Sequence, residues 1–411
     1  MNTRQFLGLD DALATLRSSV GALAATSEAV TVGAALNRIV AHDVTAPIDV
    51  PPFTASAMDG YAVCTTDPIF RTDPPYVLGV AGESRAGAPL ADTARVDHAV
   101  RIFTGAVVPA RCNSIVIQED VERDGASIRL SAPPRAGANV RPPGHDVARG
   151  ATLCRAGARL GPFDLAWLTA CGLTTIDVRA RVRLALFSTG DELRNAGESL
   201  ATGQIYDANR FVLQQLLRDA PVVVTDLGIL PDDPARIEAT LRDAAARHDA
   251  VLTSGGVSVG DADYVRAIVE RLGRIEFWKI AIKPGKPFAY GRVGDCRFFG
   301  LPGNPVSTIV TFLMLVKPIL AQLAGGRAAS VSTMPAALAV DIAHDRGRVE
   351  YQRGTFRNVD GRLVVEPTSD QSSNRIGSFR DANCLIEIPR DRGDLARGEA
   401  VAILPLTGLL S

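Results

Sequence analysis

The feature that most constrains the fold is a regular alternation of apolar runs with amphipathic segments between residues 182 and 323. The apolar runs cover residues 182–187, 222–225, 250–253 and 275–280. Parallel strands need a crossover connection, which a helix usually supplies, so this alternation predicts a parallel α/β sheet. The expected helices follow typical N-terminal residues, namely Asp207, Asp233, Asp261 and Asn304. The last helix, 305–323, should kink or break at Pro318.

The regions on either side of this block differ from it in composition and in hydrophobic pattern. A chain of 411 residues has room for several domains, since a domain typically has about 150 residues. Residues 46–146 contain short β-rich runs punctuated by Pro and Gly, with a hairpin turn expected at Asp124-Gly125. Residues 1–45 and 147–180 should form a helical and extended domain, with helical spacing over 10–40 and a helix at 163–170 that ends before Gly172. Residues 328–411 lack a helical period, which predicts a small β-barrel. The predicted class is α/β plus β in four domains, with the α/β domain at 181–327.

The charge balance and the cysteine pattern exclude several classes of protein. Forty-four basic and 45 acidic residues give a net charge of -1, so the chain lacks the long-range attraction on which non-specific binding to nucleic acid or a membrane surface depends. The six cysteines and five histidines are scattered, with no C-x-x-C pair, which signals neither a zinc cluster nor a disulfide framework. No secretory signal is evident, and the apolar run at 309–316 is too short to span a bilayer. We expect a cytoplasmic protein with no nucleic-acid or membrane partner.

The distribution of lysine is unusual. The chain has only four lysines, and three of them, Lys279, Lys283 and Lys286, fall within eight residues. An ammonium is a compact point donor, whereas a guanidinium is a broad planar fork. Because arginine supplies every other basic side chain, the cluster indicates a site that needs compact donors. The alternative is a solvated basic loop.

The loops after the predicted strands carry the residues most suited to chemistry, because ligands of open α/β sheets bind beyond the carboxyl ends of the strands. These loops are residues 188–192, 231–234, 253–263 and 301–307. Ser254-Gly255-Gly256 follows a strand and precedes a helix, so its backbone amides and the helix N-terminus favour a phosphate. The segment is neither a Walker A nor a Rossmann fingerprint, and a simple tight turn is the alternative. Asn304-Pro305 offers a second helix start for an anion, or an ordinary helix cap.

Carboxylates occur at the same sheet edge, from Asp191, Glu192, Asp261 and Asp263. Carboxylates alone would repel a phosphate, but Mg²⁺ bridges carboxylate and phosphate oxygens. The alternative is that Asp261 is only an N-cap and Glu192 only a solvated side chain. Together with the lysine cluster, the pattern predicts a site for two anions: a metal-bridged phosphoester and a second anion held by ammonium groups.

The same motifs carry a family resemblance that extends collinearly over nearly the whole chain. They are Pro51-Pro52-Phe53 with residues 56–62, residues 103–106, 188–193, 203–207, 254–263, 283–287 and 301–307. In this order they resemble the molybdopterin molybdenumtransferase family, which includes MoeA and the gephyrin E domain. The resemblance implies a Mg²⁺-dependent enzyme that takes adenylylated molybdopterin and molybdate, inserts the metal at the dithiolene and releases AMP.

The resemblance also implies an elongated homodimer, with 1–45 and 147–180 as its dimerisation domain. The β-rich domain of one subunit would face the α/β domain of the other, so that Asp59 and Thr104 act across the interface. Its partners would include a molybdopterin adenylyltransferase and apo-molybdoenzymes.

Individual roles follow from the matching motifs. The catalytic residues would be Asp59, Thr104, Asp146, Glu192, Asp232 and Asp263, and the Mg²⁺ ligands Asp191, Glu192 and Asp261. The substrate-binding residues would be Ser188, Thr189, Gly190, Asp207, Ser254, Gly255, Gly256, Ser258, Gly260, Lys279, Lys283, Lys286, Pro302, Gly303, Asn304, Pro305, Arg353 and Ser373. Of these, Arg353 and Ser373 would accompany the lysine turn.

The chain departs from the family pattern at Thr54-Ala55, at Arg111-Cys112-Asn113 and at His145, all in or beside the β-rich domain. The second departure removes a carboxylate near the expected interface. Two other functions remain open: the related pterin adenylyltransferase activity, which shares the α/β domain, and a non-catalytic scaffold that binds a peptide. The residues that precede the α/β domain carry motifs of their own, which favours metal insertion.

Overall fold

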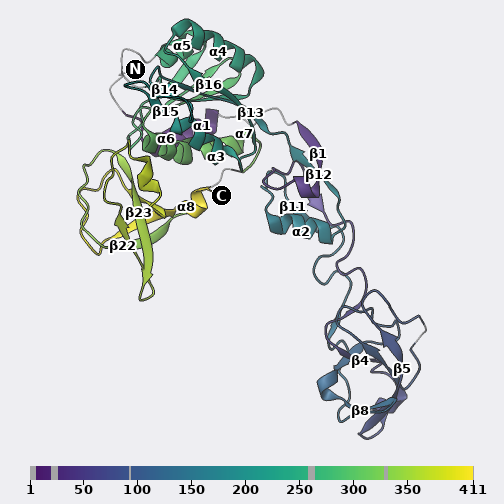
Figure 1. Ribbon diagram of the computed structural model, residues 1–411. Coiled ribbons are helices and arrows are strands. Elements are labelled where there is room, and N and C mark those ends of the chain that lie inside the picture. Colours follow the sequence, from purple (N-terminus) through teal and green to yellow (C-terminus); the bar gives the residue numbers. More distant parts are fainter. Residues whose placement is uncertain (1–5, 20–25, 92–93, 258–263, 328–331, 411) are drawn as a thin grey trace.

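A computed structural model describes residues 6–19, 26–91, 94–257, 264–327 and 332–410 of the chain. The molecule is elongated, with the α/β domain and the C-terminal domain packed together at one end (Figure 1). A narrow middle region connects them to the β-rich domain at the opposite end. The predicted class, mixed α/β with a separate β-rich domain and a small C-terminal barrel, is confirmed.

The central sheet has the strand order β16-β13-β17-β21-β20-β18. Its four parallel strands are β16 (Val222–Leu230), β13 (Val182–Thr189), β17 (Ala250–Ser254) and β21 (Cys296–Leu301). The predicted strand at 275–280 is present as β18 (Arg274–Trp278), but it does not pair in parallel. It pairs antiparallel with β20 (Ala289–Val293), which itself pairs antiparallel with β21. The hairpin from β20 to β21 therefore inserts an antiparallel strand between the parallel strands and β18.

The helices of this domain are α3 (Ala208–Leu217), α4 (Pro234–Arg247), α5 (Tyr264–Leu272) and the long helix that begins at Pro305. Asp207 caps α3 by accepting the amide of Arg210, and Asp233 caps α4 by accepting the amide of Ala235, both as predicted. Asp261, the predicted cap of α5, lies outside the described residues.

The long helix passes Pro318 without a break. It runs as α6 (Pro305–Thr311), a π-helical turn (Phe312–Val316) and α7 (Lys317–Leu323). Pro318 has no N–H to donate and its ring crowds the carbonyl four residues earlier, and the wider π turn accommodates both effects. The helix is long and apolar enough to cross a membrane, but 83% of its most apolar window is buried inside the protein, which accounts for its composition.

Helix α1 (Leu9–Ser19) packs on the α/β domain. Its buried residues Leu9, Ala12 and Leu16 belong to the same core cluster as the long helix. Within the described residues, the helical pattern expected over 10–40 is realised as α1 and as one short 3₁₀ turn at Val32–Ala34. Residues 27–31 are instead β1 (Ser27–Thr31), paired antiparallel with β12 (Thr175–Arg179), because Val and Thr favour strands.

The middle region also contains α2 (Pro162–Ala170), which ends as predicted before Gly172 at φ +81°. Short ladders extend it toward the β-rich domain: β2 (Val44–Thr45) pairs with β11 (Thr152–Cys154), and β3 (Ala55–Ser56) pairs with β10 (Val140–Arg141).

The β-rich domain is a sheet of order β7-β4-β6-β5-β9-β8. Its strands are β4 (Gly60–Val63), β5 (Tyr76–Ser84), β6 (His98–Ile102), β7 (Ser114–Ile117), β8 (Glu122–Asp124) and β9 (Ser127–Leu130). The hairpin predicted at Asp124-Gly125 is confirmed, since Asp124 pairs with Ser127 and Gly125 adopts φ +53°.

The C-terminal barrel contains β22 (Met334–Leu338), β23 (Val349–Val359), β24 (Arg362–Pro367), β25 (Cys384–Ile388) and β26 (Ala400–Pro405), followed by α8 (Leu406–Leu410). Strand β23 pairs with both β24 and β25, which closes the barrel. One strand of the preceding domain joins it: β19 (Ile282–Lys283) pairs in parallel with β23. This pairing places the lysine turn against the barrel.

Candidate functional site

A pocket of about 270 Å³ lies at the carboxyl ends of the parallel strands. It is lined by Thr189, Gly190, Glu192, Leu193, Ile205, Tyr206, Asp207, Ala208, Asn209, Asp232, Ser254, Gly255, Gly256, Val257, Gly303 and Pro305. The pocket gathers all four loops that the strand pattern placed at this edge. Among the predicted residues, Ser188 lies below it, fully buried in β13, and Ser258, Gly260 and Asp263 are outside the described residues.

The glycine loop approaches the end of β13 very closely. Gly255 and Gly256 have φ of +91° and +71°, a region that favours glycine. A Cβ on Gly255 would lie 2.9 Å from the backbone oxygen of Thr189, and one on Gly256 would lie 2.4 Å from Val265 Cγ2. The loop therefore exposes its backbone to the pocket in a conformation that a side chain would disrupt. This is the arrangement expected of a loop that holds a phosphate with amide groups.

Carboxylates line the pocket but do not form a closed metal cage. Glu192 and Asp232 belong to the lining, whereas Asp191 lies beside it and accepts a hydrogen bond from the Asp232 amide at 3.2 Å. The Asp207 carboxylate is already engaged by Arg210 in capping α3. No group of three potential metal ligands occurs among the described residues, which leave out Asp261 and Asp263.

The second group of predicted residues lies where the barrel meets α6. Asn304 does not cap α6 with its side chain; instead its amide donates to Ser373 Oγ at 2.9 Å, and Val306 N donates to Ser373 O at 3.0 Å. Since Gly303 lines the pocket, the 303–304 segment connects the pocket to this second group. Lys283 also faces the barrel, with its Nζ 3.1 Å from Glu350 Oε2.

Arg353 is buried rather than open to a ligand, with 1% of its surface exposed. Its guanidinium donates to Ser378 Oγ and to the carbonyls of Asp370 and Ser372. These bonds hold the loop that carries Ser373, so Arg353 shapes this part of the site.

The other two clustered lysines contact aromatic rings. Lys279 Nζ lies 4.0 Å from the ring centre of Trp278, and Lys286 Nζ lies 4.9 Å from that of Phe6. Trp278 Nε1 donates to the Val257 carbonyl at 2.8 Å, which joins the lysine segment to the glycine loop. The three ammonium groups therefore have different surroundings, and they do not form one solvated basic loop.

The predicted catalytic residues of the β-rich domain lie at the far end of the chain from the pocket (Figure 1). There, Thr104 donates its amide and its hydroxyl to Asp59 Oδ1, both at 2.8 Å. These two hydrogen bonds lower the pKa of Asp59 from its ordinary value. Asp146 is exposed, in the connection back to the middle region. One chain alone does not bring these residues to the pocket.

Two pocket residues with polar groups, Tyr206 and Asn209, have no role among those predicted from the sequence, although Tyr206 lies within the motif at 203–207. Asn209, in the first turn of α3, donates to Ser254 Oγ at 2.9 Å and to the Gly303 carbonyl at 2.6 Å, so it links two loops of the pocket. Tyr206 lines the pocket and is 46% exposed, which offers an aromatic face to a planar ligand. Tyr206 directly precedes the helix-start residue Asp207 and Asn209 follows it by two positions, and this location at the sheet edge could have identified both.

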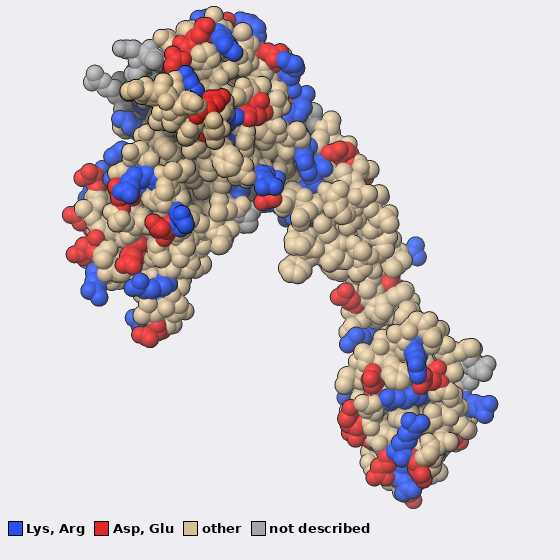
Figure 2. Space-filling model, in the orientation of Figure 1, with Lys and Arg blue, Asp and Glu red and all other residues tan. Residues whose placement is uncertain are grey.

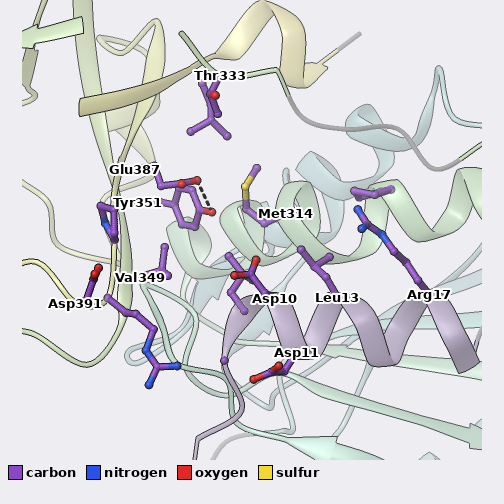
Figure 3. A pocket seen from close by; sticks show the side chains of 16 residues that line it. Asp10, Asp11, Leu13, Arg17, Met314, Thr333, Val349, Tyr351, Glu387 and Asp391 are labelled. Carbon is purple, nitrogen blue, oxygen red and sulfur yellow. Dashed lines mark hydrogen bonds between the residues drawn. The ribbon is translucent and has the colours of Figure 1, made fainter. Parts of the chain in front are cut away.

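A larger cavity, of about 540 Å³, lies away from this edge between α1 and the barrel (Figure 3). Asp10, Leu13 and Arg17 of α1 line one side of it. On the barrel side, Tyr351 donates its hydroxyl to Glu387 Oε2 at 2.9 Å, and burial raises the pKa of this tyrosine. None of the predicted site residues lines this cavity.

Comparison with known proteins agrees with this arrangement. Residues 7–172 match the MoeA N-terminal region (domain I and II), residues 185–322 a probable molybdopterin binding domain, and residues 335–406 the MoeA C-terminal region (domain IV). The molybdopterin molybdenumtransferase of Haemophilus influenzae is 41% identical over 379 residues, which cover 92% of this chain and 93% of that protein. The chain belongs to the molybdopterin molybdenumtransferase family.

Other members of this family and its solved structures are similar over nearly the whole chain. A crystal structure of the MoeA protein from Pyrococcus horikoshii superposes with a TM-score of 0.84 at 29% identity and covers 98% of this chain and 100% of that one. Gephyrin from Dictyostelium discoideum is 30% identical over 91% of this chain and 58% of its own length. The chain is therefore an enzyme of molybdenum cofactor biosynthesis, of the molybdopterin molybdenumtransferase type.

One departure from the family pattern has a structural role within the β-rich domain. Arg111 forms an ion pair with Asp67, which is 1% exposed. Asn113 accepts the Thr65 amide and donates to the Thr65 hydroxyl, both at 2.9 Å. These positions stabilise the domain's own loops.

Proposed function

We propose that the chain inserts molybdate into the dithiolene of adenylylated molybdopterin and releases AMP in a Mg²⁺-dependent reaction. The observation that carries this proposal is the adjacency of two different anion sites. The glycine-loop pocket suits a phosphoanhydride. The Asn304–Ser373 contact beside it, together with Lys283 at the edge of the barrel, would supply donors for a compact oxyanion. The 303–304 segment belongs to both.

The residues of the pocket would position and orient the substrates. Backbone amides of the glycine loop would hold the phosphates, and Tyr206 would pack against a planar ring. Lys283 and Ser373 would hold the four oxygens of molybdate beside the dithiolene. As the two thiols bond to molybdenum, one oxygen ligand would take their two protons and leave as water, and a separate water molecule would cleave the phosphoanhydride bond to release AMP.

Mg²⁺ fits the donor set that the pocket presents. This ion usually binds through one or two carboxylates together with substrate phosphates, rather than in an all-protein cage. Glu192 in the lining and Asp191 beside it would supply such ligands, together with Asp261, which lies outside the described residues. Asp232, predicted as a catalytic residue, also lines the pocket. When bound, Mg²⁺ would neutralise phosphate charge during cleavage.

We also propose that the working form is a homodimer with a shared site. Asp59 and Thr104 are remote from the pocket of their own chain, so a partner would have to supply them. The middle region carries few charged side chains on the face seen in Figure 2, and Phe163 on α2 is 88% exposed. A surface with few charges and an exposed aromatic side chain suits contact with a second copy. A cytoplasmic location, with an adenylyltransferase and apo-molybdoenzymes as partners, fits this role.

The function is tested by supplying adenylylated molybdopterin, Mg²⁺ and molybdate and measuring AMP release. Glu192→Gln should reduce turnover strongly without loss of folding, because it removes only the charge. Asp243→Asn on α4, whose carboxylate is exposed and paired with Arg247, is the matched control and should leave turnover unchanged. Equal turnover in the two variants would remove Glu192 from the mechanism.

The same assay separates the alternatives. An adenylyltransferase would form AMP-linked molybdopterin from ATP without molybdate, and a scaffold would do neither. For the shared site, Asp59→Asn and Glu192→Gln proteins would each be inactive alone. Heterodimers of the two should recover part of the activity, and a complete lack of recovery would place each site within one chain.

A further inference from the structure

The strand that carries Lys283 is in register with the barrel. In the parallel pairing of β19 with β23, Ile282 lies opposite Val349 and Lys283 lies opposite Glu350. The amide of Val349 donates to the Ala281 carbonyl at 3.0 Å, which fixes this register. The position of Lys283 is therefore set by the barrel as well as by its own domain.

Glu350 is a buried carboxylate: one of its oxygens accepts a hydrogen bond within the barrel, and the other faces Lys283. Its side chain is 4% exposed, and Oε1 accepts a hydrogen bond from Gln352 Nε2 at 3.1 Å. Oε2 makes no hydrogen bond within the described residues and lies 3.1 Å from Lys283 Nζ. A buried carboxylate is costly unless a cation compensates it, so the pair constrains both side chains.

His344 completes the surroundings of this carboxylate. Its ring is 1% exposed, with Nε2 3.6 Å from Glu350 Oε2. Nδ1 lies 3.1 Å from the Arg392 carbonyl, which only accepts, so Nδ1 carries a hydrogen. The histidine is thus held by the barrel and packs behind the carboxylate, which limits the directions that Glu350 can take.

The two ends of the ion pair differ in exposure. The Lys283 side chain is 43% exposed, ten times the exposed fraction of its partner. An ammonium has three donors, so one can face Glu350 while the others face the open side. Within the described part of the chain, Lys283 is the one clustered lysine with a carboxylate partner, since Lys279 and Lys286 lie over aromatic rings.

We propose that Glu350 is a positioning residue for the oxyanion site: from inside the barrel it holds the ammonium of Lys283 in the place where molybdate is bound. This inference rests on the proposed function, because it takes Lys283 as a molybdate ligand. It assigns the barrel a role in substrate binding through a side chain that does not itself touch the anion.

The test is direct binding of molybdate by equilibrium dialysis, without the pterin substrate. At metal sites, substitution of a residue that orients a ligating side chain typically weakens metal binding by roughly 10- to 100-fold, and we take this as the scale for a residue that orients an anion ligand. We expect a loss in this range for Glu350→Gln. A carboxylate that acted only through its charge would repel the anion, so its removal would tighten binding. The direction of the change therefore distinguishes positioning from simple electrostatics.

A double substitution tests whether Glu350 acts on molybdate binding through Lys283. In a Lys283→Met protein, adding Glu350→Gln should weaken molybdate binding no further, because the positioned group is already gone. Glu366→Gln is the matched control, since Glu366 lies on the same barrel in an exposed pair with Arg357. In AMP release, Glu350→Gln should raise the half-saturating molybdate concentration and leave the maximal rate nearly unchanged.

The outcomes separate the two proposals. If the wild-type chain neither binds molybdate nor releases AMP, the proposed function fails. If the wild type binds molybdate and Glu350→Gln binds it equally well or more tightly, the role of Glu350 fails while the function stands. Should Glu350→Gln not fold, as judged by circular dichroism, Glu350→Asp keeps the charge and shortens the reach. It should bind more weakly than the wild type, and wild-type affinity would again reject the positioning role.

Discussion

Gly255→Ala is the change that most directly probes the close approach of the glycine loop to β13. At φ +91°, an alanine would cost on the order of 1–2 kcal/mol from backbone conformation alone. The added Cβ would also lie 2.9 Å from the Thr189 carbonyl oxygen, which cannot rotate away. Overpacking of this kind adds about 1–3 kcal/mol, so we expect a total loss of roughly 2–5 kcal/mol in the free energy of unfolding.

Gly228→Ala is the matched control. Gly228 lies in the same domain at φ +77°, and a Cβ there would meet nothing within 4 Å. It should therefore show only the conformational cost, about 1–2 kcal/mol. The difference between the two variants measures the contact with Thr189, free of the backbone contribution.

The unfolding of this domain can be followed by tryptophan fluorescence. The chain has two tryptophans, and a Trp167→Phe background leaves only Trp278, which is bonded to the glycine loop. Urea titrations would give the two free-energy changes, and AMP release would report the site. Gly228→Ala should retain turnover, whereas Gly255→Ala should lose most of it even where it is folded. Equal losses of stability, or full turnover in Gly255→Ala, would refute the role assigned to the close approach.

Three further predictions concern titration and the barrel loop. Burial lowers the pKa of Lys317 from 10.5 to about 8. Between these two pH values the unfolded chain binds more protons than the folded one, so the free energy of unfolding should rise with pH. Urea titrations of the wild type and of Lys317→Met should therefore diverge between pH 8 and 10.5, and parallel pH dependences would contradict this prediction. The Asp370 carboxylate pairs with Arg375 at 2.8 Å and accepts the Ser372 amide at 2.7 Å. Asp370→Asn removes the charge of this pair, so it should loosen the loop that carries Ser373 and raise the half-saturating molybdate concentration in AMP release; an unchanged value would count against the idea. Burial raises three thiol pKa values to about 12, so these cysteines should resist alkylation at pH 8 until the protein unfolds, and rapid labelling of the native protein would show otherwise. They are Cys112, Cys296 and Cys384.

The sequence by itself determined the elements that depend on neighbouring residues. Mainly apolar runs predicted the strands β13, β16 and β17, although β13 contains Arg183 and β16 extends beyond its run to Leu230. Asp207 and Asp233 mark the starts of helices α3 and α4. Because these signals are local, they predicted the sheet edge and the loops that line the pocket. The local rules were insufficient for residues 27–31, which form a strand in a region that looked helical. At Pro318 the local rule predicted the place of an irregularity in the helix, and the structure shows its form, a π turn.

Only the tertiary structure decided how the charged groups are paired. The lysine cluster predicted an anion site, but Lys283 differs from its neighbours because a strand of the barrel places Glu350 opposite it. The family resemblance implied that Arg353 binds substrate, yet it is buried and bonded to backbone carbonyls. Such pairings join residues far apart in the chain, and their geometry follows from strand register and burial. Strand register and the burial of a single charged residue produce no periodic pattern in the sequence. The direction and the surroundings of each charged group could therefore be determined only from the folded protein.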